Sequence, residues 1–197
     1  MLICDALPST IEVGGVLLPI CTGFRRHLAA ETLDRENPDA GIKLLWLYMA
    51  KRGNGGARQL PEEVHEDPAA WLEAAMAWHD QALSALDYGD PLAPKGSGTT
   101  RVFDWEADEG IICCDFQRFY GIDIADPATQ MHWWRFCTLL MGLVRTDGAL
   151  VSAAIAARSP LPANAPKELK KAHRAQAAAW ALPPTEDELR ARLAKTF

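Results

Sequence analysis

Five carboxylates lie close together in the middle of this 197-residue chain, where they could serve as general acids and bases or bind a metal ion. They are Asp104, Glu106, Asp108, Glu109 and Asp115. Most of them fall in the first two turns of a predicted helix, where acidic side chains interact favourably with the helix dipole. Asp108 and Asp115 share a helix face, but seven residues separate them by about 10 Å along the axis. The spacing therefore favours a structural role, and we expect no enzymatic activity.

Thiols and imidazoles near these acids suggest zinc, but their spacing does not support it. Cys113 and Cys114 are adjacent, so on a helix they point about 100° apart, and no cysteine pair has the two-to-four-residue spacing of structural zinc sites. Cys137 falls on a strongly apolar helix, where a free cysteine behaves as a small hydrophobic residue. His132 and His79 are expected to be partly buried polar residues. The sequence also lacks phosphate-loop and nucleophile-elbow motifs. We therefore expect neither a metal ion nor another cofactor.

Composition and charge limit the partners. The chain is 49% hydrophobic and 23% charged, with a net charge of −6, which is typical of a globular protein and does not favour binding to nucleic acid. Residues 166–197 carry +3 and the rest −9. Their basic residues lack the interleaved aromatic side chains of a nucleic-acid-stacking surface. The N-terminus has no secretory signal, no stretch is apolar enough to span a membrane, and the five cysteines do not form a disulfide framework. These features predict a cytoplasmic protein that binds neither nucleic acid nor membranes.

The N-terminal residues predict a β-hairpin over about 9–21. Ile11 and Val13 alternate with polar residues, and Val16 begins a second alternating run. Gly14-Gly15 between the runs supplies the positive φ angles that a two-residue hairpin turn requires. An isolated hairpin is only marginally stable in water, so we expect this one to dock on helices.

The remaining sequence predicts helices, with flexible linkers near 52–60 and 88–101. Gly121 is expected to end one helix as a C′ residue, and Thr185 with Glu188 forms a capping box for the last. The sequence therefore predicts a mainly α fold of about six to eight helices with the hairpin docked on it. We interpret 1–183 as a single domain and 184–197 as a C-terminal extension. The predicted helices cover residues 24–36, 39–51, 67–86, 104–120, 126–143, 147–157 and 167–181, with a short helix after Thr185.

Aromatic residues are concentrated between Phe103 and Leu143. The predicted helix over 126–143 is apolar around nearly its whole circumference, so protein must surround it. We expect this region to form the centre of the core or of an oligomer. The predicted core residues are Trp105, Phe116, Phe119, Trp133, Trp134 and Phe136.

Two blocks of sequence resemble the bacteriophage gene-product-fifteen family of long-tailed phages and prophages. The first block runs from Leu7 through the Gly-Gly turn to Arg25. The second contains Phe-Asp-Trp-Glu-Ala-Asp from Phe103, Phe-Gln-Arg-Phe-Tyr-Gly from Phe116 and His-Trp-Trp-Arg-Phe from His132. The closing Trp180-Ala181-Leu182-Pro183 also looks like the end of this family. Gly23 departs from the acidic residue expected before Phe-Arg, and the two linkers are unusually rich in glycine and proline.

The resemblance implies a non-enzymatic tail assembly chaperone. Such a protein would bind the helical tape-measure protein and keep it soluble until the tail-tube protein polymerises around it, and would be expected to form homo-oligomers. Apolar surface is needed for that task, and Trp46, Trp71 and Trp78 are the candidate partner-binding residues, although all three could instead be core residues. The alternative function is a structural virion component, such as a tail-completion or connector protein.

Overall fold

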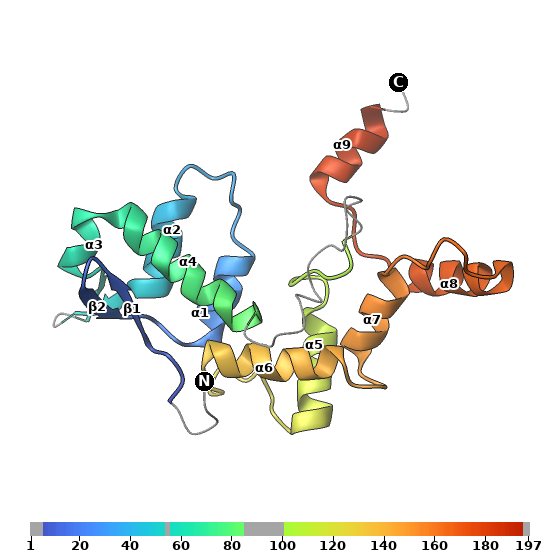
Figure 1. Cartoon of the computed structure of the whole chain (residues 1–197), viewed down its shortest axis with the longest axis horizontal. Helices are drawn as coiled ribbons and strands as arrows, with labels where there is room; N and C mark the ends of the chain where they lie inside the picture. The colour runs from blue at the N-terminus through green and yellow to red at the C-terminus, as the bar shows by residue number, and fades with distance from the viewer. Residues whose placement is uncertain (1–5, 54–55, 85–100, 195–197) are drawn as a thin grey trace. The chain divides into compact units, whose positions relative to one another are not determined.

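A computed structural model describes residues 6–53, 56–84 and 101–194 and confirms the predicted mainly helical fold with an N-terminal hairpin (Figure 1). The chain divides into two compact units. Unit 1 comprises residues 1–90 and 116–142, and unit 2 comprises 91–115 and 143–197. The single domain over 1–183 stays a prediction. Most of the predicted linker at 88–101 lies outside the described residues.

The N-terminal hairpin forms as predicted. Strand β1 (Thr10–Val13) pairs antiparallel with β2 (Val16–Pro19), and Val13 lies opposite Val16. Gly14 and Gly15 have φ angles of +56° and +83°, the left-handed pair that a type I′ turn requires. Strand β1 packs against a helix of unit 1, α4 (Pro68–Ser84), so the expected docking on helices is also found.

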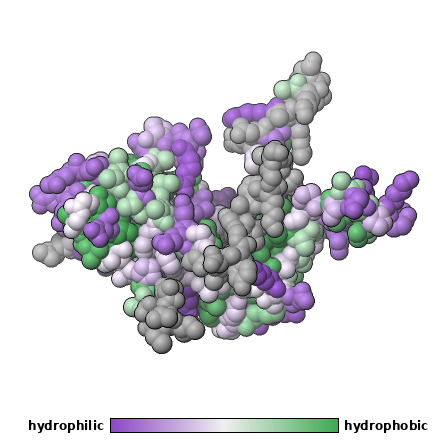
Figure 2. All heavy atoms as spheres, viewed as in Figure 1, coloured by the Kyte–Doolittle hydropathy of each residue, from purple (hydrophilic) through white to green (hydrophobic). Residues whose placement is uncertain are grey.

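Helices α1 (Phe24–Glu31) and α2 (Ala40–Met49) pack against each other, and α2 also packs against α4. A short helix, α3 (Glu62–Glu66), precedes α4 and was not predicted. Two short strands, β3 (Lys51–Arg52) and β4 (Arg58–Gln59), pair within the segment predicted to be a flexible linker. On the face of the molecule drawn in Figure 2, hydrophobic residues lie at the surface among hydrophilic ones around β1, β2 and α4.

The strongly apolar helix was predicted to begin at Asp126. In the structure this helix, α6 (Trp133–Val144), begins seven residues later. The Arg25 guanidinium binds the preceding segment and donates hydrogen bonds to the carbonyls of Ile124 (2.8 Å), Asp126 (2.6 Å) and Thr129 (2.5 Å). Carbonyls that accept from Arg25 are turned away from the i→i+4 pattern of a helix. The backbone N–H of Trp133 instead donates to Thr22 O at 2.6 Å. The prediction of helix over 126–132 was therefore wrong.

The helix predicted over 104–120 is divided into a turn, α5 (Glu109–Asp115) and a π-helical segment, η1 (Phe116–Tyr120). Asp104 accepts hydrogen bonds from the backbone N–H groups of Glu106 and Ala107, which holds the turn before α5. Gly121 ends η1 with a φ of +66°, as predicted for a C′ glycine.

Unit 2 contains α5, α7 (Leu150–Arg158), α8 (Lys167–Ala179) and α9 (Glu186–Ala194). Helix α7 packs against both α5 and α8. The predicted capping box begins α9: Thr185 N donates to Glu188 Oε2 at 2.9 Å, and Glu188 N donates to Thr185 Oγ1 at 3.2 Å. No helix in the described part of the chain is both long enough and apolar enough to cross a membrane.

Candidate functional site

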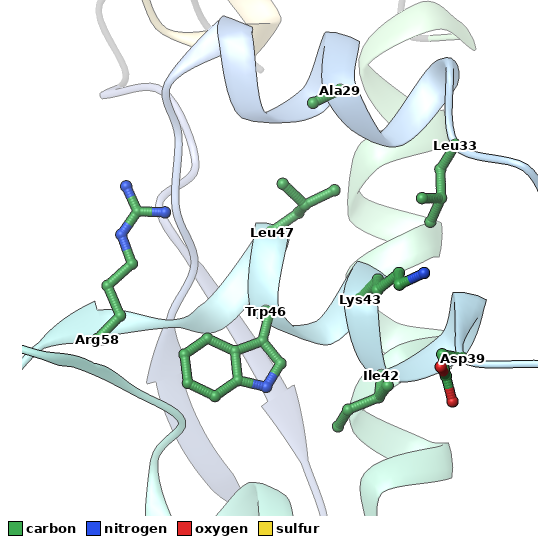
Figure 3. A pocket seen from close by; sticks show the side chains of 8 residues that line it. All are labelled: Ala29, Leu33, Asp39, Ile42, Lys43, Trp46, Leu47 and Arg58. Atoms are coloured by element: carbon green, nitrogen blue, oxygen red, sulfur yellow. The ribbon is translucent and has the colours of Figure 1, made fainter.

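The surface of unit 1 carries an apolar groove between α1 and α2, which we call the α1–α2 groove (Figure 3). Its volume is about 590 Å³, within the range of ligand and peptide sites. The groove is lined by Ala29, Leu33, Asp39, Ile42, Lys43, Trp46, Leu47 and Arg58.

The sequence of α2 explains why this surface is apolar. One face of the helix lies in the core, with Leu45, Tyr48 and Met49 almost fully buried. Ile42 and Trp46 stand one turn apart on a different face, where 47% and 40% of their surfaces are exposed. A helix apolar on both sides therefore supplies a core face and a surface face.

Charged residues border the groove. Asp39 lies at the beginning of α2, Lys43 lies one turn later, and Arg58 comes from β4 (Figure 3). Neither Lys43 nor Arg58 forms an ion pair with a carboxylate of the residues that the structure describes. An apolar floor with two cations at its edge suits an amphipathic helix that carries acidic residues beside its apolar stripe.

The three tryptophans predicted to contact a partner have different surroundings. Trp46 lines the groove, but Trp71 and Trp78 are only 3% and 6% exposed. The indole of Trp71 donates to Glu63 O at 3.1 Å, and the Trp78 ring lies 5.8 Å from that of Trp134. Trp71 and Trp78 are core residues, the alternative that the sequence left open for all three, because α4 is covered by α2, α3 and β1. Sequence reasoning missed Ile42 and Arg58; the i,i+4 pair of Ile42 with Trp46 was the available signal.

Beneath the groove, unit 1 has an aromatic core that contains four of the six predicted core residues. The Phe136 ring is stacked between Phe24 and Phe116, with centroids 5.1 Å away on each side, and Trp133 lies 5.6 Å from it. Trp134 is buried as well.

The other two predicted core residues, Trp105 and Phe119, are less buried. In unit 2, Trp105 is half-buried and its ring meets the edge of Phe103. In unit 1, Phe119 is exposed, with the Arg118 guanidinium over its ring. Phe119 was placed in the core by a 3.6-residue period, but the wider turns of a π-helix change which side chains share a face.

A chain of polar side chains crosses the core of unit 1 and was not recognised in the sequence. His27 and His79 are both buried, and their Nδ1 atoms lie 2.8 Å apart. His27 Nε2 lies 2.7 Å from Cys21 O, and His79 Nε2 contacts the Glu31 carboxylate. Both imidazoles stack on Trp133, whose indole N–H donates to His79 O at 3.1 Å. Burial lowers the pKa of His27 to about 3, so this side chain is neutral near pH 7.

The acids and thiols that could have formed a catalytic site have structural environments instead. Asp108 accepts two hydrogen bonds from Arg158, at 2.7 and 2.8 Å, in a buried ion pair of unit 2. Asp115 accepts from Val151 N at 2.9 Å, which caps the beginning of α7. Burial raises the pKa of the Cys137 thiol well above its usual value. Among the described residues, no three His, Cys, Asp or Glu side chains gather where they could hold a metal ion.

Comparison with known proteins identifies a family for this chain. The profile of a family described as "Bacteriophage Gp15 protein" matches residues 3–182. The match includes the α1–α2 groove and the aromatic core, and it ends before α9. No curated protein and no solved structure matches the chain.

Proposed function

Because the chain belongs to the bacteriophage Gp15 protein family, we propose that it is a non-enzymatic tail assembly chaperone. In this function it binds the phage tape-measure protein in the host cytoplasm and keeps it soluble before the tail-tube protein polymerises around it. The chaperone acts as a homo-oligomer and uses neither a cofactor nor a metal ion.

The observation that carries this proposal is the exposed pair of Ile42 and Trp46 in the α1–α2 groove. A soluble protein that leaves two large apolar side chains one turn apart in a concave surface has a surface suited to another protein. Tape-measure proteins are long and helical, so their unassembled helices expose apolar stripes. Anchors at i, i+3 or i+4, and i+7 of such a helix would enter the groove, while acidic neighbours would face Lys43 and Arg58.

Co-expression with the tape-measure protein of the same phage tests this function. We expect the client to be soluble only when this chain is present. Ile42→Asp and Trp46→Ser together should return most of the client to the insoluble fraction. Leu169→Asp is a matched control, because Leu169 is a similarly exposed apolar residue on α8. A client that stays equally soluble with the double variant would contradict the assignment to the groove.

Mass spectrometry of purified virions distinguishes this function from that of a structural virion component. A chaperone leaves before the particle is complete, so its peptides should be absent or far below the level of tail proteins. Stoichiometric amounts in virions would instead establish a tail-completion or connector role.

A further inference from the structure

The α1–α2 groove carries charge of opposite sign at its two ends. Residues 34–39, which lead into α2, contain three acids and one arginine, a balance of −2. Residues 50–59, which follow α2, contain three cations and no acid, a balance of +3. These charged residues are all exposed, and they are Asp34, Arg35, Glu36, Asp39, Lys51, Arg52 and Arg58. Figure 3 shows Asp39 and Arg58 on opposite sides of Trp46, so the charge changes sign along the groove.

The dipole of α2 does not account for these charges. A helix dipole is equivalent to about half a unit charge at each end, so balances of −2 and +3 exceed what α2 can compensate. Arg26 already donates to the carbonyls of Leu47 and Ala50, at 3.2 and 2.9 Å, at the C-terminal end of α2. The cations of β3 and β4 are therefore not needed to cap this helix.

The positions of Arg52 and Arg58 are unfavourable for the chain by itself. The two arginines are directly opposite each other in the pairing of β3 with β4. Like charges on directly opposite residues destabilise a pair of strands. Neither arginine forms an ion pair with a carboxylate in the part of the chain that the structure describes. A carboxylate from a bound partner would relieve this repulsion, and Arg58 already lines the groove where a partner would lie.

We propose that the α1–α2 groove binds a client helix in one charge order, with the acidic end of that helix at Arg52 and Arg58 and its basic end at Asp39. This inference rests on the proposed function, in which an amphipathic helix of the tape-measure protein occupies the groove, and adds the direction in which that helix lies. Ile42 and Trp46 supply apolar contacts in either direction. The order is set by attraction of acids at the arginines and by their repulsion at Asp39.

Lys43 is the third charged residue in the lining of the groove. It lies within α2, one turn after Asp39, so it favours acidic residues near the middle of the client helix. The excess of positive charge therefore remains at the end formed by β3 and β4.

Cross-linking of the full-length chain to designed helical peptides tests the order. Two synthetic peptides of about 18 residues carry the same leucine stripe. The first has glutamates in its N-terminal half and lysines in its C-terminal half, and the second has the reverse. Each peptide is made with a photoreactive group at one end or at the other. In both peptides the glutamate end should cross-link to β3 and β4 and the lysine end to residues 34–39, with about a tenfold excess over the reverse order at low salt.

A charge-swapped variant gives the most specific outcome. Arg52→Glu and Arg58→Glu, combined with Glu36→Lys and Asp39→Lys, exchange the signs of the two ends of the groove. The cross-links should then exchange ends as well, and that exchange also shows that the variant is folded and binds the peptides.

The matched control is Lys171→Glu with Arg174→Glu, which reverses two exposed cations on α8 in unit 2. Its cross-links should keep the wild-type order. Added salt should reduce the preference for this order in the wild-type chain, because the end charges are exposed.

Several results would overturn the charge order. Cross-links that follow the chain direction of the peptides, or that form equally at both ends, would show that the groove does not select by charge. A charge-swapped variant that keeps the wild-type order would show the same. In these cases the groove would still bind helices, so the proposed client site would stand. Peptides that do not cross-link to the groove at all would contradict the site together with the order.

Discussion

The Nδ1 atoms of His27 and His79 face each other at 2.8 Å inside the aromatic core of unit 1. The contact dictates where the protons lie. Cys21 O can only accept, so His27 Nε2 carries a proton; because burial keeps His27 neutral near pH 7, its Nδ1 then accepts from His79 Nδ1. At the other end of the chain of groups, His79 Nε2 contacts the Glu31 carboxyl group. Burial, which lowers the pKa of His27, is what keeps this imidazole neutral.

This arrangement predicts loss of stability in mild acid. The pKa of His27 is about 3 in the folded protein and 6.5 in an unfolded chain, so the unfolded state binds more protons between these values. The free energy of unfolding should therefore decrease as the pH falls below 6.5, and His27 should account for about 2–3 kcal/mol of the loss between pH 7 and pH 4.5. His27→Gln can still donate to Cys21 O but does not titrate. Urea denaturation across this range should give a shallower pH dependence for His27→Gln than for wild type.

The matched control for this prediction is His65→Gln, because His65 lies exposed on α3. Its pH profile should follow that of wild type. Identical slopes for wild type and His27→Gln would mean that His27 does not contribute to the acid sensitivity.

Two phenylalanines that the sequence placed in the same core should respond differently to truncation. Phe136 is stacked on two rings and almost fully buried, so Phe136→Ala should lower the free energy of unfolding by about 3–5 kcal/mol. Phe119 is exposed and contacts Arg118, so Phe119→Ala should cost less than about 1 kcal/mol. Chemical denaturation of both variants checks the difference; equal losses would contradict the π-helical placement of Phe119.

Arg25 should be needed to hold residues 124–129. Arg25→Met removes three hydrogen bonds from a charged donor and leaves the carbonyls of Ile124, Asp126 and Thr129 without it, so we expect a loss of about 2–4 kcal/mol. Amide hydrogen exchange should also become faster in this segment. Arg52→Met, at an exposed position on β3, should stay within about 0.5 kcal/mol of wild type. Unchanged exchange in the Arg25 variant would show that the segment keeps its conformation without the guanidinium.

Local chemistry explains the predictions that succeeded. The Gly14-Gly15 turn, the Gly121 terminus and the Thr185–Glu188 capping box are each decided within a few residues. Phe116 and Phe136 could also be placed in the core from the density of aromatic residues around them.

Contacts between residues far apart in the sequence explain the predictions that were wrong and the features that were missed. Arg25 acts on carbonyls about a hundred positions away, and 52 residues separate His27 from His79. Neither separation leaves a periodic trace in the sequence. Of the three tryptophans predicted to contact a partner, only Trp46 lies in the groove. Trp71 is buried because other elements cover α4, and the sequence of α4 does not show which elements these are. A helical period identifies faces, but it cannot tell which face meets another element.

The division into units has a consequence for how the protein is made. The chain leaves unit 1 after residue 90, returns at 116 and leaves again after 142, so neither unit is encoded by one continuous stretch. A ribosome therefore releases α1 and α2 long before Phe116, Trp133 and Phe136, which complete the core beneath them. During that interval Phe24 and His27 have no aromatic partners from the later segment. Unit 1 can complete its folding only after residue 142 has been synthesised. A gene fragment that ends at residue 90 would encode α1 and α2 without the aromatic residues of 116–142 that pack against them.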